Sequence, residues 1–353
     1  MIRKLFIHCG LHKTGSTALQ SALSRSADEL REMGFLYPGA GRLGEISGHH
    51  NIAWQLTRDR RFAQSLGTLD TLFDEIEHFD GDVILSSEDF EGVLTCPAKW
   101  PALVQRASRA GLVPIAIIYL RNQAAYLESL YQEMVAHGFG EEFGIYSESM
   151  LRSGSLRLKE WRFQFDYNTV AESTSSIYGL NVLFRNYHAL AGGSVISDFF
   201  DAIDALAPQH IQQSRANARD PIGDSLTHFY RNRVQRALED SEAQAIEQLL
   251  ARMSGEPRLS PGLLEKIAER FAEPNRRICD LYSVDPRGLT DFSRPGAATS
   301  FARVEKLFSF ETQLAIASIA TLLDRRASKQ LQQVDLEQTR VLEDWQNWIH
   351  SDP

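Results

Sequence analysis

The stretch Lys4-Leu5-Phe6-Ile7-His8-Cys9-Gly10-Leu11-His12-Lys13-Thr14-Gly15-Ser16-Thr17-Ala18-Leu19-Gln20 decides the fold. Its first part is a short apolar run that predicts a buried strand. From Ser16 onward the apolar residues follow helical spacing, at Ala18, Leu19, Ala22 and Leu23. Gly10 and Gly15 lie in the turn between the two parts. The stretch therefore predicts a strand, a glycine-containing loop and the start of a helix.

This geometry directs free backbone N–H groups and the positive end of a helix dipole at one point. Lys13 adds a full charge there, and Thr14, Ser16 and Thr17 add hydroxyl groups. A phosphate or sulfate group is the ligand that suits these donors. The plainer interpretation is an ordinary glycine turn with a surface lysine.

The order of residues in the loop argues against an ATP-binding loop of the Walker type. That signature places its lysine directly after the second glycine, whereas Lys13 precedes Gly15. The sequence also shows no Walker B acidic pair, which would bind Mg²⁺ in such an enzyme. A nucleotide-dependent kinase of the P-loop class stays an alternative, and it would require Mg²⁺-dependent ATP consumption.

Composition describes an ordinary globular chain and limits its partners. The 353 residues are 43% hydrophobic and 24% charged, with a formal net charge of −9. We expect no general attraction to nucleic acid or an anionic membrane. The longest apolar run, residues 112–120, is far below the roughly 18 residues that span a bilayer. Three scattered cysteines and the absence of a signal-peptide pattern favour a soluble, cytoplasmic protein.

Short apolar strands alternate with longer helical patterns through the first part of the chain. Strands are expected at residues 82–86, 112–120 and 181–184, and helices at 16–33, 66–79, 100–110, 124–137, 167–178 and 198–206. Such alternation predicts an α/β fold with a mostly parallel central sheet flanked by helices. Ligands of these sheets bind at the carboxyl ends of the strands, where residues 10–17, 86–90 and 121–129 fall.

The remainder of the chain is expected to be helical. We take residues 1–209 as an α/β core and residues 210–353 as a helical region packed on it, with helices at 226–238, 242–253, 261–281 and 301–349. A dimerisation pair among these C-terminal helices is an alternative use of the same segment.

A second anion site is predicted after the strand at 112–120. Arg121 follows that strand directly, and Ser129 comes eight residues later in the next helix. A guanidinium group binds phosphate oxygens through two parallel hydrogen bonds and never loses its charge. A serine hydroxyl adds another donor.

The two motifs together resemble those of sulfotransferases that use 3′-phosphoadenosine-5′-phosphosulfate (PAPS). Lys13-Thr14-Gly15-Ser16-Thr17 is similar to their phosphosulfate loop, and Arg121 with Ser129 is similar to their 3′-phosphate site, spacing included. The resemblance covers about residues 3–205, with weaker likeness at residues 85–90, at 181–187 and at the helix that carries Asn275. It implies a P-loop-like three-layer sulfotransferase fold. The Arg-Lys-Gly-x-x-Gly-Asp-Trp signature of eukaryotic members is absent, so further 3′-phosphate ligands are open and Arg185 is only a candidate.

The resemblance implies sulfuryl transfer from PAPS to a hydroxyl or amine of a small molecule, a lipid head group or a glycan. Lys13 would stabilise the leaving group, residues 14–17 would hold the 5′-phosphate, and His12 would contact phosphate. No metal is expected, because a sulfuryl group carries less charge than a phosphoryl group. A non-catalytic nucleotide-binding module is a further alternative.

The sequence offers His12, His49, His50 and Glu88 as the base that takes the acceptor proton. His50 and Glu88 are the two leading candidates, although an ordinary helix-start histidine and a helix-capping carboxylate are the plainer interpretations. His50 titrates near neutral pH and follows a glycine-rich loop, and Glu88 lies at a strand end. We rank His50 slightly above Glu88. Arg152, Arg157, Lys159 and Arg162 form either a basic lid over an anionic acceptor or over PAPS, or a solvated charged face.

Overall fold

The computed structural model describes residues 2–44, 48–138, 143–158, 161–208, 259 and 261–292. The chain divides into two compact units, one formed by Met1–Asp220 with Leu259–Ala297 and the other by Pro221–Arg258 with Ala298–Pro353. The second unit lies outside the described residues, and with it the helices expected at 226–238, 242–253 and 301–349.

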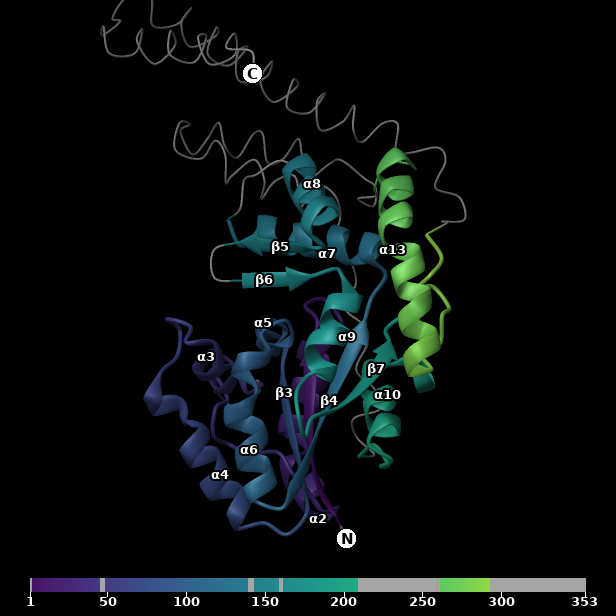
Figure 1. The fold of residues 1–353 in the computed structure, drawn as a ribbon. Coiled ribbons are helices and arrows are strands. Elements are labelled where there is room, and N and C mark those ends of the chain that lie inside the picture. Colours follow the sequence, from purple (N-terminus) through teal and green to yellow (C-terminus); the bar gives the residue numbers. More distant parts are fainter. Residues whose placement is uncertain are drawn as a thin grey trace, which may run out of the picture. The chain divides into compact units, whose positions relative to one another are not determined.

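A five-stranded parallel sheet forms the centre of the first unit, in the order β2-β3-β1-β4-β7 (Figure 1). Its strands are β1 (Arg3–Gly10), β2 (Phe35–Leu36), β3 (Asp82–Ser87), β4 (Leu112–Leu120) and β7 (Asn181–Asn186). The long strands are apolar and buried, as strands covered on both faces must be. The expected α/β class with a mostly parallel sheet is confirmed.

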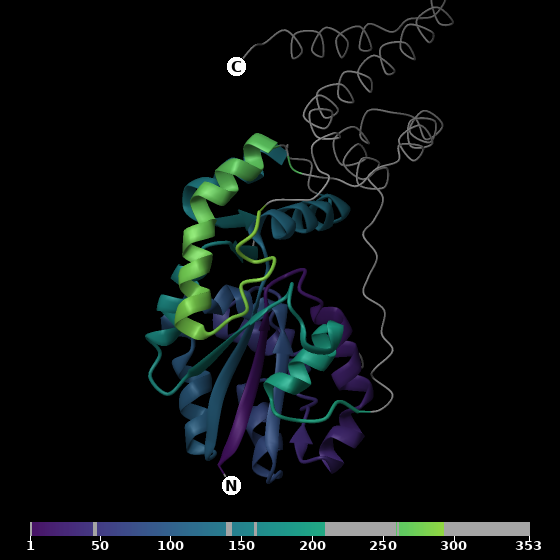
Figure 2. The same ribbon diagram turned by 90° about the vertical axis from the view of Figure 1, so that its right-hand side faces the viewer.

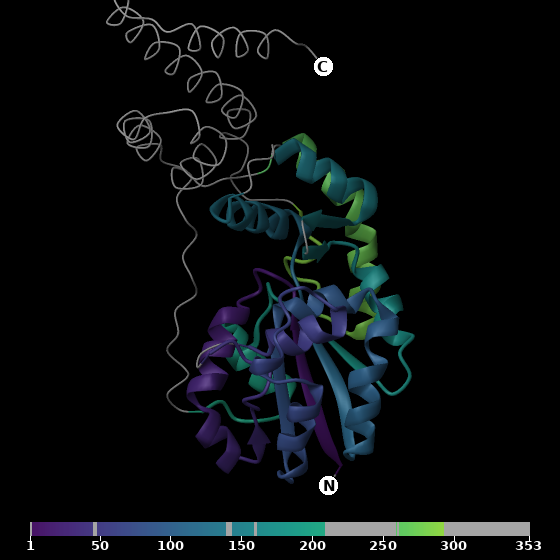
Figure 3. The same ribbon diagram turned by 90° about the vertical axis from the view of Figure 1, so that its left-hand side faces the viewer.

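Helices cover both faces of this sheet. One face packs against α1 (Ser16–Arg25), α2 (Ala27–Glu32) and α10 (Val195–Ala202), and Figure 2 is viewed from the side of α10. Buried side chains from these helices and the sheet form one core cluster, in which Leu19, Leu23, Phe199 and Phe200 are almost fully enclosed. The opposite face packs against α4 (Leu69–Glu77) and α6 (Pro101–Arg109), which lie in front of the sheet in Figure 3.

The remaining elements gather at the carboxyl end of the sheet or beside it. They are α3 (His50–Thr57), α5 (Glu91–Leu94), α7 (Gln123–Ala136), α8 (Phe143–Ser153), β5 (Ser155–Leu158), β6 (Trp161–Gln164), α9 (Tyr167–Ser175), α13 (Pro261–Tyr282) and the 3-10 turns η1 (Gln64–Leu66), η2 (Glu88–Phe90), η3 (Pro97–Lys99) and η4 (Ala191–Gly193). β5 and β6 form a separate antiparallel pair. α13 contacts α7, α8 and α9.

Three sequence expectations differ most from the structure. The helix expected at 198–206 begins three residues earlier and ends four residues earlier, as α10 (Val195–Ala202). The helix expected at 16–33 is interrupted at Ser26, where α1 ends and α2 begins. Ser26 is followed by Asp28 and Glu29, and acidic residues are favoured in the first turn of a new helix. No helix or strand is expected between the predicted helices at 124–137 and 167–178, yet this stretch contains α8 and the β5–β6 pair. Periodicity could not indicate the two strands because each has only four residues.

Candidate functional site

Three of the predicted ligand loops meet at the carboxyl edge of the sheet. β1 pairs in parallel with β3 and with β4, so that Cys9 aligns with Ser87 on one side and Gly10 aligns with Tyr119 on the other. The glycine loop therefore leaves the central strand between the loop after β3 and the loop after β4. This is also where the strand order reverses direction, which is the usual position of a ligand site in such sheets.

The glycine loop, residues 10–15, is shaped by two left-handed residues. Lys13 and Gly15 have positive φ values of 64° and 83°. A side chain at Gly10 would place its Cβ 2.3 Å from Ser16 Oγ, so the Ser16 hydroxyl would have to move to admit one. The Thr14 hydroxyl is buried and donates to the carbonyl oxygen of Leu11 at 2.6 Å, which fixes the loop from within.

Donors at the start of α1 remain available for an anion. Gly15 caps the helix without a side-chain hydrogen bond. Among the described residues, the backbone N–H groups of Gly15, Ser16 and Thr17 meet no acceptor, and the ammonium group of Lys13 pairs with no carboxylate. The Ser16 hydroxyl is buried and also lacks a partner within the described residues. This donor set fits a phosphate group.

Arg121 brings the second predicted anion site to the glycine loop. It follows β4 directly, and its Nη1 donates a short hydrogen bond to the carbonyl oxygen of Lys13. Its guanidinium group also lies 5.2 Å from the ring centre of Tyr187. The two motifs, 108 residues apart in the sequence, are thus in direct contact.

Buried polar contacts hold the backbone at Arg121. Tyr167 donates its hydroxyl to the Arg121 carbonyl oxygen, and the N–H of Asn122 donates to Nε2 of His188 at 2.9 Å. Gln123 exchanges two hydrogen bonds, of 2.9 and 2.8 Å, with the fully buried Asn275 of α13. Asn275 therefore positions the start of α7, although it lies far away in the sequence.

The two other residues predicted near the 3′-phosphate lie in different surroundings. Ser129 is half-buried on α7, and its hydroxyl has no partner among the described residues. Arg185 on β7 forms two hydrogen bonds of 2.8 Å with Asp198 and an ion pair of 2.7 Å with Asp201. The hydrogen bond to Asp198 raises the pKa of Arg185 further above its usual range. Its guanidinium group already serves two carboxylates on α10.

His50 forms a histidine–aspartate pair at the carboxyl end of β3. Its Nδ1 lies 2.8 Å from Oδ2 of Asp89 and 3.0 Å from the hydroxyl of Ser87. Its Nε2 meets no partner among the described residues. Burial alone would lower the pKa of His50, but the Asp89 hydrogen bond and the charges of Glu88 and Asp89 outweigh it and raise that pKa. With Asp89 at Nδ1, Nε2 is the atom left to accept a proton.

Asp89 has a second basic partner. Arg61 Nη2 lies 3.2 Å from Oδ1 of Asp89, and the same guanidinium group binds Asp59 through bonds of 3.0 and 2.8 Å. Burial would raise the pKa of Asp89, yet the His50 hydrogen bond and the neighbouring positive groups lower it. Asp89 therefore stays ionised and fixes the orientation of His50.

The other candidate base, Glu88, is engaged differently. Its Oε2 accepts a 2.6 Å hydrogen bond from Nε2 of Gln20 on α1. It acts on His50 through its charge, as one of the groups that raise the pKa of that histidine. The structure thus brings both candidate bases to the end of β3. They differ in their partners, because a carboxylate orients the ring of His50 whereas Glu88 accepts a hydrogen bond from Gln20.

Two further histidines are buried and neutral. Burial lowers the pKa of His8 and of His49 to about 3. His8 contacts the Ser86 hydroxyl at 2.7 Å, and His49 contacts the carbonyl oxygen of Pro38 at 3.0 Å. His12, within the glycine loop, instead packs its ring edge-on against Phe163, with 4.9 Å between the ring centres.

Glu91 is a buried carboxyl group that sequence reasoning missed. It accepts hydrogen bonds from the backbone N–H groups of His12 and Gln164, at 3.1 and 2.5 Å, and from the hydroxyl of Tyr126, at 3.1 and 3.0 Å. Burial raises the pKa of Glu91 to about 7. It joins the glycine loop to β6 and α7. In the sequence Glu91 is one of three acidic residues that follow a strand, in Glu88-Asp89-Phe90-Glu91, and nothing there predicts that it is buried.

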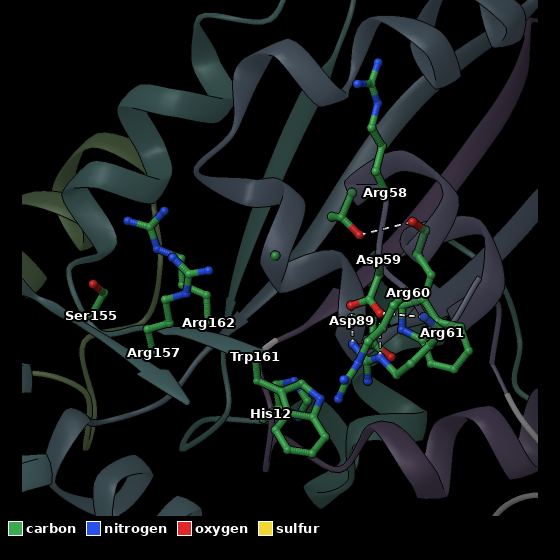
Figure 4. Close-up of a pocket in the computed structure, with 13 residues that line it drawn as sticks. His12, Arg58, Asp59, Arg60, Arg61, Asp89, Ser155, Arg157, Trp161 and Arg162 are labelled. Atoms are coloured by element: carbon green, nitrogen blue, oxygen red, sulfur yellow. Dashed lines mark hydrogen bonds and ion pairs between the residues drawn. The ribbon is translucent and has the colours of Figure 1, made fainter. Parts of the chain in front are cut away.

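A cavity of about 640 Å³ opens beside the histidine–aspartate pair (Figure 4). Its charged lining consists of five arginines and two aspartates, namely Arg58, Arg60, Arg61, Arg157, Arg162, Asp59 and Asp89. Trp54, Trp161 and His12 also line it. Arg157 and Arg162, which the sequence placed in a basic stretch, belong to this wall, whereas Lys159 lies outside the described residues.

Two other kinds of feature, a membrane-spanning helix and a metal site, are not found in the described part of the chain. None of the described helices has the length and apolar character needed to cross a bilayer. No three His, Cys, Asp or Glu side chains among the described residues gather in a metal-like group. In comparisons with known proteins, no family model, no curated protein and no solved structure matches the chain.

Proposed function

We propose that this protein is a sulfotransferase that moves a sulfuryl group from PAPS to a hydroxyl or amine acceptor. The observation that carries the proposal is the contact between Arg121 and the carbonyl oxygen of Lys13. This contact connects two parts: the glycine loop, whose free donors suit one phosphate group, and an arginine that suits a second phosphate group. A doubly phosphorylated adenosine is a ligand with two anionic ends that such a pair could hold.

The donor set at the glycine loop supports binding of the 5′ end. The unpaired N–H groups of Gly15, Ser16 and Thr17 would hold the phosphate, and Lys13 would supply positive charge beside it. Arg121, with Ser129 on the next helix, would hold the 3′-phosphate. PAPS supplies the sulfuryl group, and the bond to its bridging oxygen breaks with the electron pair staying on the departing bisphosphate.

Besides the charge of Lys13, the chain contributes proton transfer to the chemistry. Nε2 of His50 accepts the proton of the acceptor hydroxyl as its oxygen bonds to sulfur, and Asp89 holds the ring and stabilises the imidazolium. Glu88 contributes its negative charge nearby. Because the pKa of His50 is raised, we expect this base to need a higher pH than an ordinary histidine would.

Thermal unfolding with adenosine 3′,5′-bisphosphate (PAP), compared with ATP and Mg²⁺, tests the cofactor class. At a PAP concentration one hundred times its Kd, the folded state should gain about 2.7 kcal/mol and Tm should rise by several degrees. ATP with Mg²⁺ at the same concentration should raise Tm much less.

Two variants show whether the predicted residues produce that stabilisation. Arg121→Lys keeps the charge but loses the planar fork, and it should reduce the rise in Tm given by PAP. Arg109→Gln removes an exposed arginine of α6 and should leave that rise unchanged. A larger rise with ATP and Mg²⁺ than with PAP would contradict the proposal and favour the kinase alternative.

A further inference from the structure

The arginine cavity, defined above by its lining, carries an excess of positive charge in an acidic protein. The chain has a formal net charge of −9, yet the cavity holds five arginines against two aspartates. Both aspartates are bound to Arg61. Arg58, Arg157 and Arg162 form no ion pair with any described residue. The cavity therefore presents charge that the described protein groups do not neutralise.

Arg157 and Arg162 are the clearest sign of a ligand. They lie directly opposite each other in the antiparallel β5–β6 pair. Like charges at such positions destabilise a strand pair, and an anion between them removes the repulsion. Figure 4 shows the two side chains next to each other, across the cavity from Asp59, Asp89 and Arg61.

The cavity adjoins the predicted base and not the predicted donor site. Asp89 lines it and holds His50, and the rings of Trp54 and His50 are 6.1 Å apart. Apart from His12, none of the residues predicted to bind PAPS lines it. This favours the acceptor over PAPS as its occupant.

We infer that the arginine cavity binds an acceptor that already carries a carboxylate, sulfate or phosphate group, held by Arg157 and Arg162 while its hydroxyl faces His50. This inference rests on the proposed function, because it takes the cavity to be the acceptor site. It narrows the substrate class from any alcohol or amine to an anionic one.

Binding to the full chain with saturating PAP tests the inference, with sucrose octasulfate as the anionic probe and sucrose as its neutral parent. The octasulfate should bind and sucrose should not. The double variant Arg157→Gln/Arg162→Gln should weaken octasulfate binding at least tenfold, because each arginine loses a charge-assisted contact. Arg109→Gln, the exposed arginine of α6, is the matched control and should bind as the wild type does.

A transfer assay adds a second readout with p-nitrophenyl β-D-glucuronide and p-nitrophenyl β-D-glucoside, which differ only in having a carboxylate or a hydroxymethyl group at one carbon. Wild type should prefer the glucuronide about tenfold or more in kcat/KM, and the double variant should lose that preference. Equal use of the two acceptors, octasulfate binding that ignores both substitutions, or weaker PAP binding by the double variant would each overturn the inference.

The two proposals fail in distinguishable ways. If PAP binds but the arginines have no effect on the anionic probe, the acceptor inference is wrong and the sulfotransferase proposal stands. If PAP does not bind, the proposed function is wrong, and the acceptor inference that rests on it falls as well.

Discussion

The glycine loop and the arginine cavity are both positively charged, but they are built in opposite ways. The loop consists of consecutive residues between β1 and α1, and its donors come mainly from the backbone. The cavity is assembled from side chains on four segments, around residues 12, 54–61, 89–92 and 155–162. The backbone site can be recognised in the sequence because its shape is local. The side-chain site requires the fold, since the sequence alone does not show that Arg157 and Arg162 lie near Asp59 and Asp89.

Replacing Lys13 tests whether the glycine loop and the arginine cavity have separate roles, and it should change kcat more than any other substitution considered. Lys13→Ala should lower kcat about 10³-fold, the size seen when one donor to a developing negative charge is removed. The loss should be equal for anionic and neutral acceptors, because the loop serves the donor. The measurement is kcat for the glucuronide and the glucoside.

The fold should survive this substitution, because the ammonium group of Lys13 pairs with no described carboxylate. Tm should therefore match that of the wild type. Lys266→Ala, at an exposed position on α13, is the control and should be fully active. Loss confined to the anionic acceptor would assign Lys13 to the cavity and break the comparison.

Glu91 links the glycine loop to β6, the strand that carries Arg162, and gives a prediction on stability. Because burial raises its pKa to about 7, the folded protein holds a proton that the unfolded chain releases near pH 4.5. The free energy of unfolding should therefore fall as pH rises from about 4.5 to 7, by on the order of 3 kcal/mol from this group. Urea unfolding at pH 5 and pH 7.5 measures the change.

Glu91→Gln cannot titrate and should lack this part of the pH dependence. Glu77→Gln, an exposed residue of α4, should keep the wild-type slope. Identical slopes in wild type and Glu91→Gln would mean that the carboxyl group is ionised throughout. The hydrogen bonds from His12 and Gln164 would then dominate over burial.

Much of the fold was predictable from the sequence because its strands and helices are long enough for periodicity. β4 coincides with the apolar run at 112–120, and α7 differs by one residue at each end from the expected 124–137. The hairpin β5–β6 was not predictable, since four-residue strands with exposed Arg157 and Arg162 give no clear alternation. Its alignment across the pair became visible only in three dimensions.

The candidate site divides in the same way. Sequence placed Lys13 and Arg121 at strand ends, and their contact follows from the order of the strands. His50 was a candidate from residue chemistry, but its partner Asp89 is 39 residues away, so nothing local links them. The sequence analysis missed Glu91 and assigned no role to Asn275, for the same reason. Each acts through contacts with distant elements, and one sequence does not encode those contacts in any local pattern.

Asp89→Asn tests whether the region next to the cavity holds the base. Removing this carboxylate should lower the pKa of His50, because the Asp89 hydrogen bond and charge help to raise it. The acidic limb of the kcat/KM profile should move to lower pH, and the rate at the optimum should fall roughly tenfold, or about 1.4 kcal/mol. NMR titration of His50 reads the pKa without relying on activity.

Asp59→Asn is the matched control for that change. Asp59 also binds Arg61, but it does not touch His50. Its pH profile should keep the wild-type limb. If the acidic limb of the kcat/KM profile does not move in Asp89→Asn, His50 is not the base and Glu88 is left as the candidate.

Ser129→Ala should give the smallest effect, and it tests which residues bind PAPS rather than the acceptor. Its half-buried hydroxyl has no described partner and lies on the helix after Arg121, so its loss should weaken PAP binding about fivefold, or ~1 kcal/mol. The rate at saturating PAPS should not change. Ser108→Ala, on the exposed side of α6, should leave the Kd for PAP unaltered. If Ser129→Ala instead lowered only the rate, its hydroxyl would act on the acceptor, and the 3′-phosphate would depend on Arg121 alone.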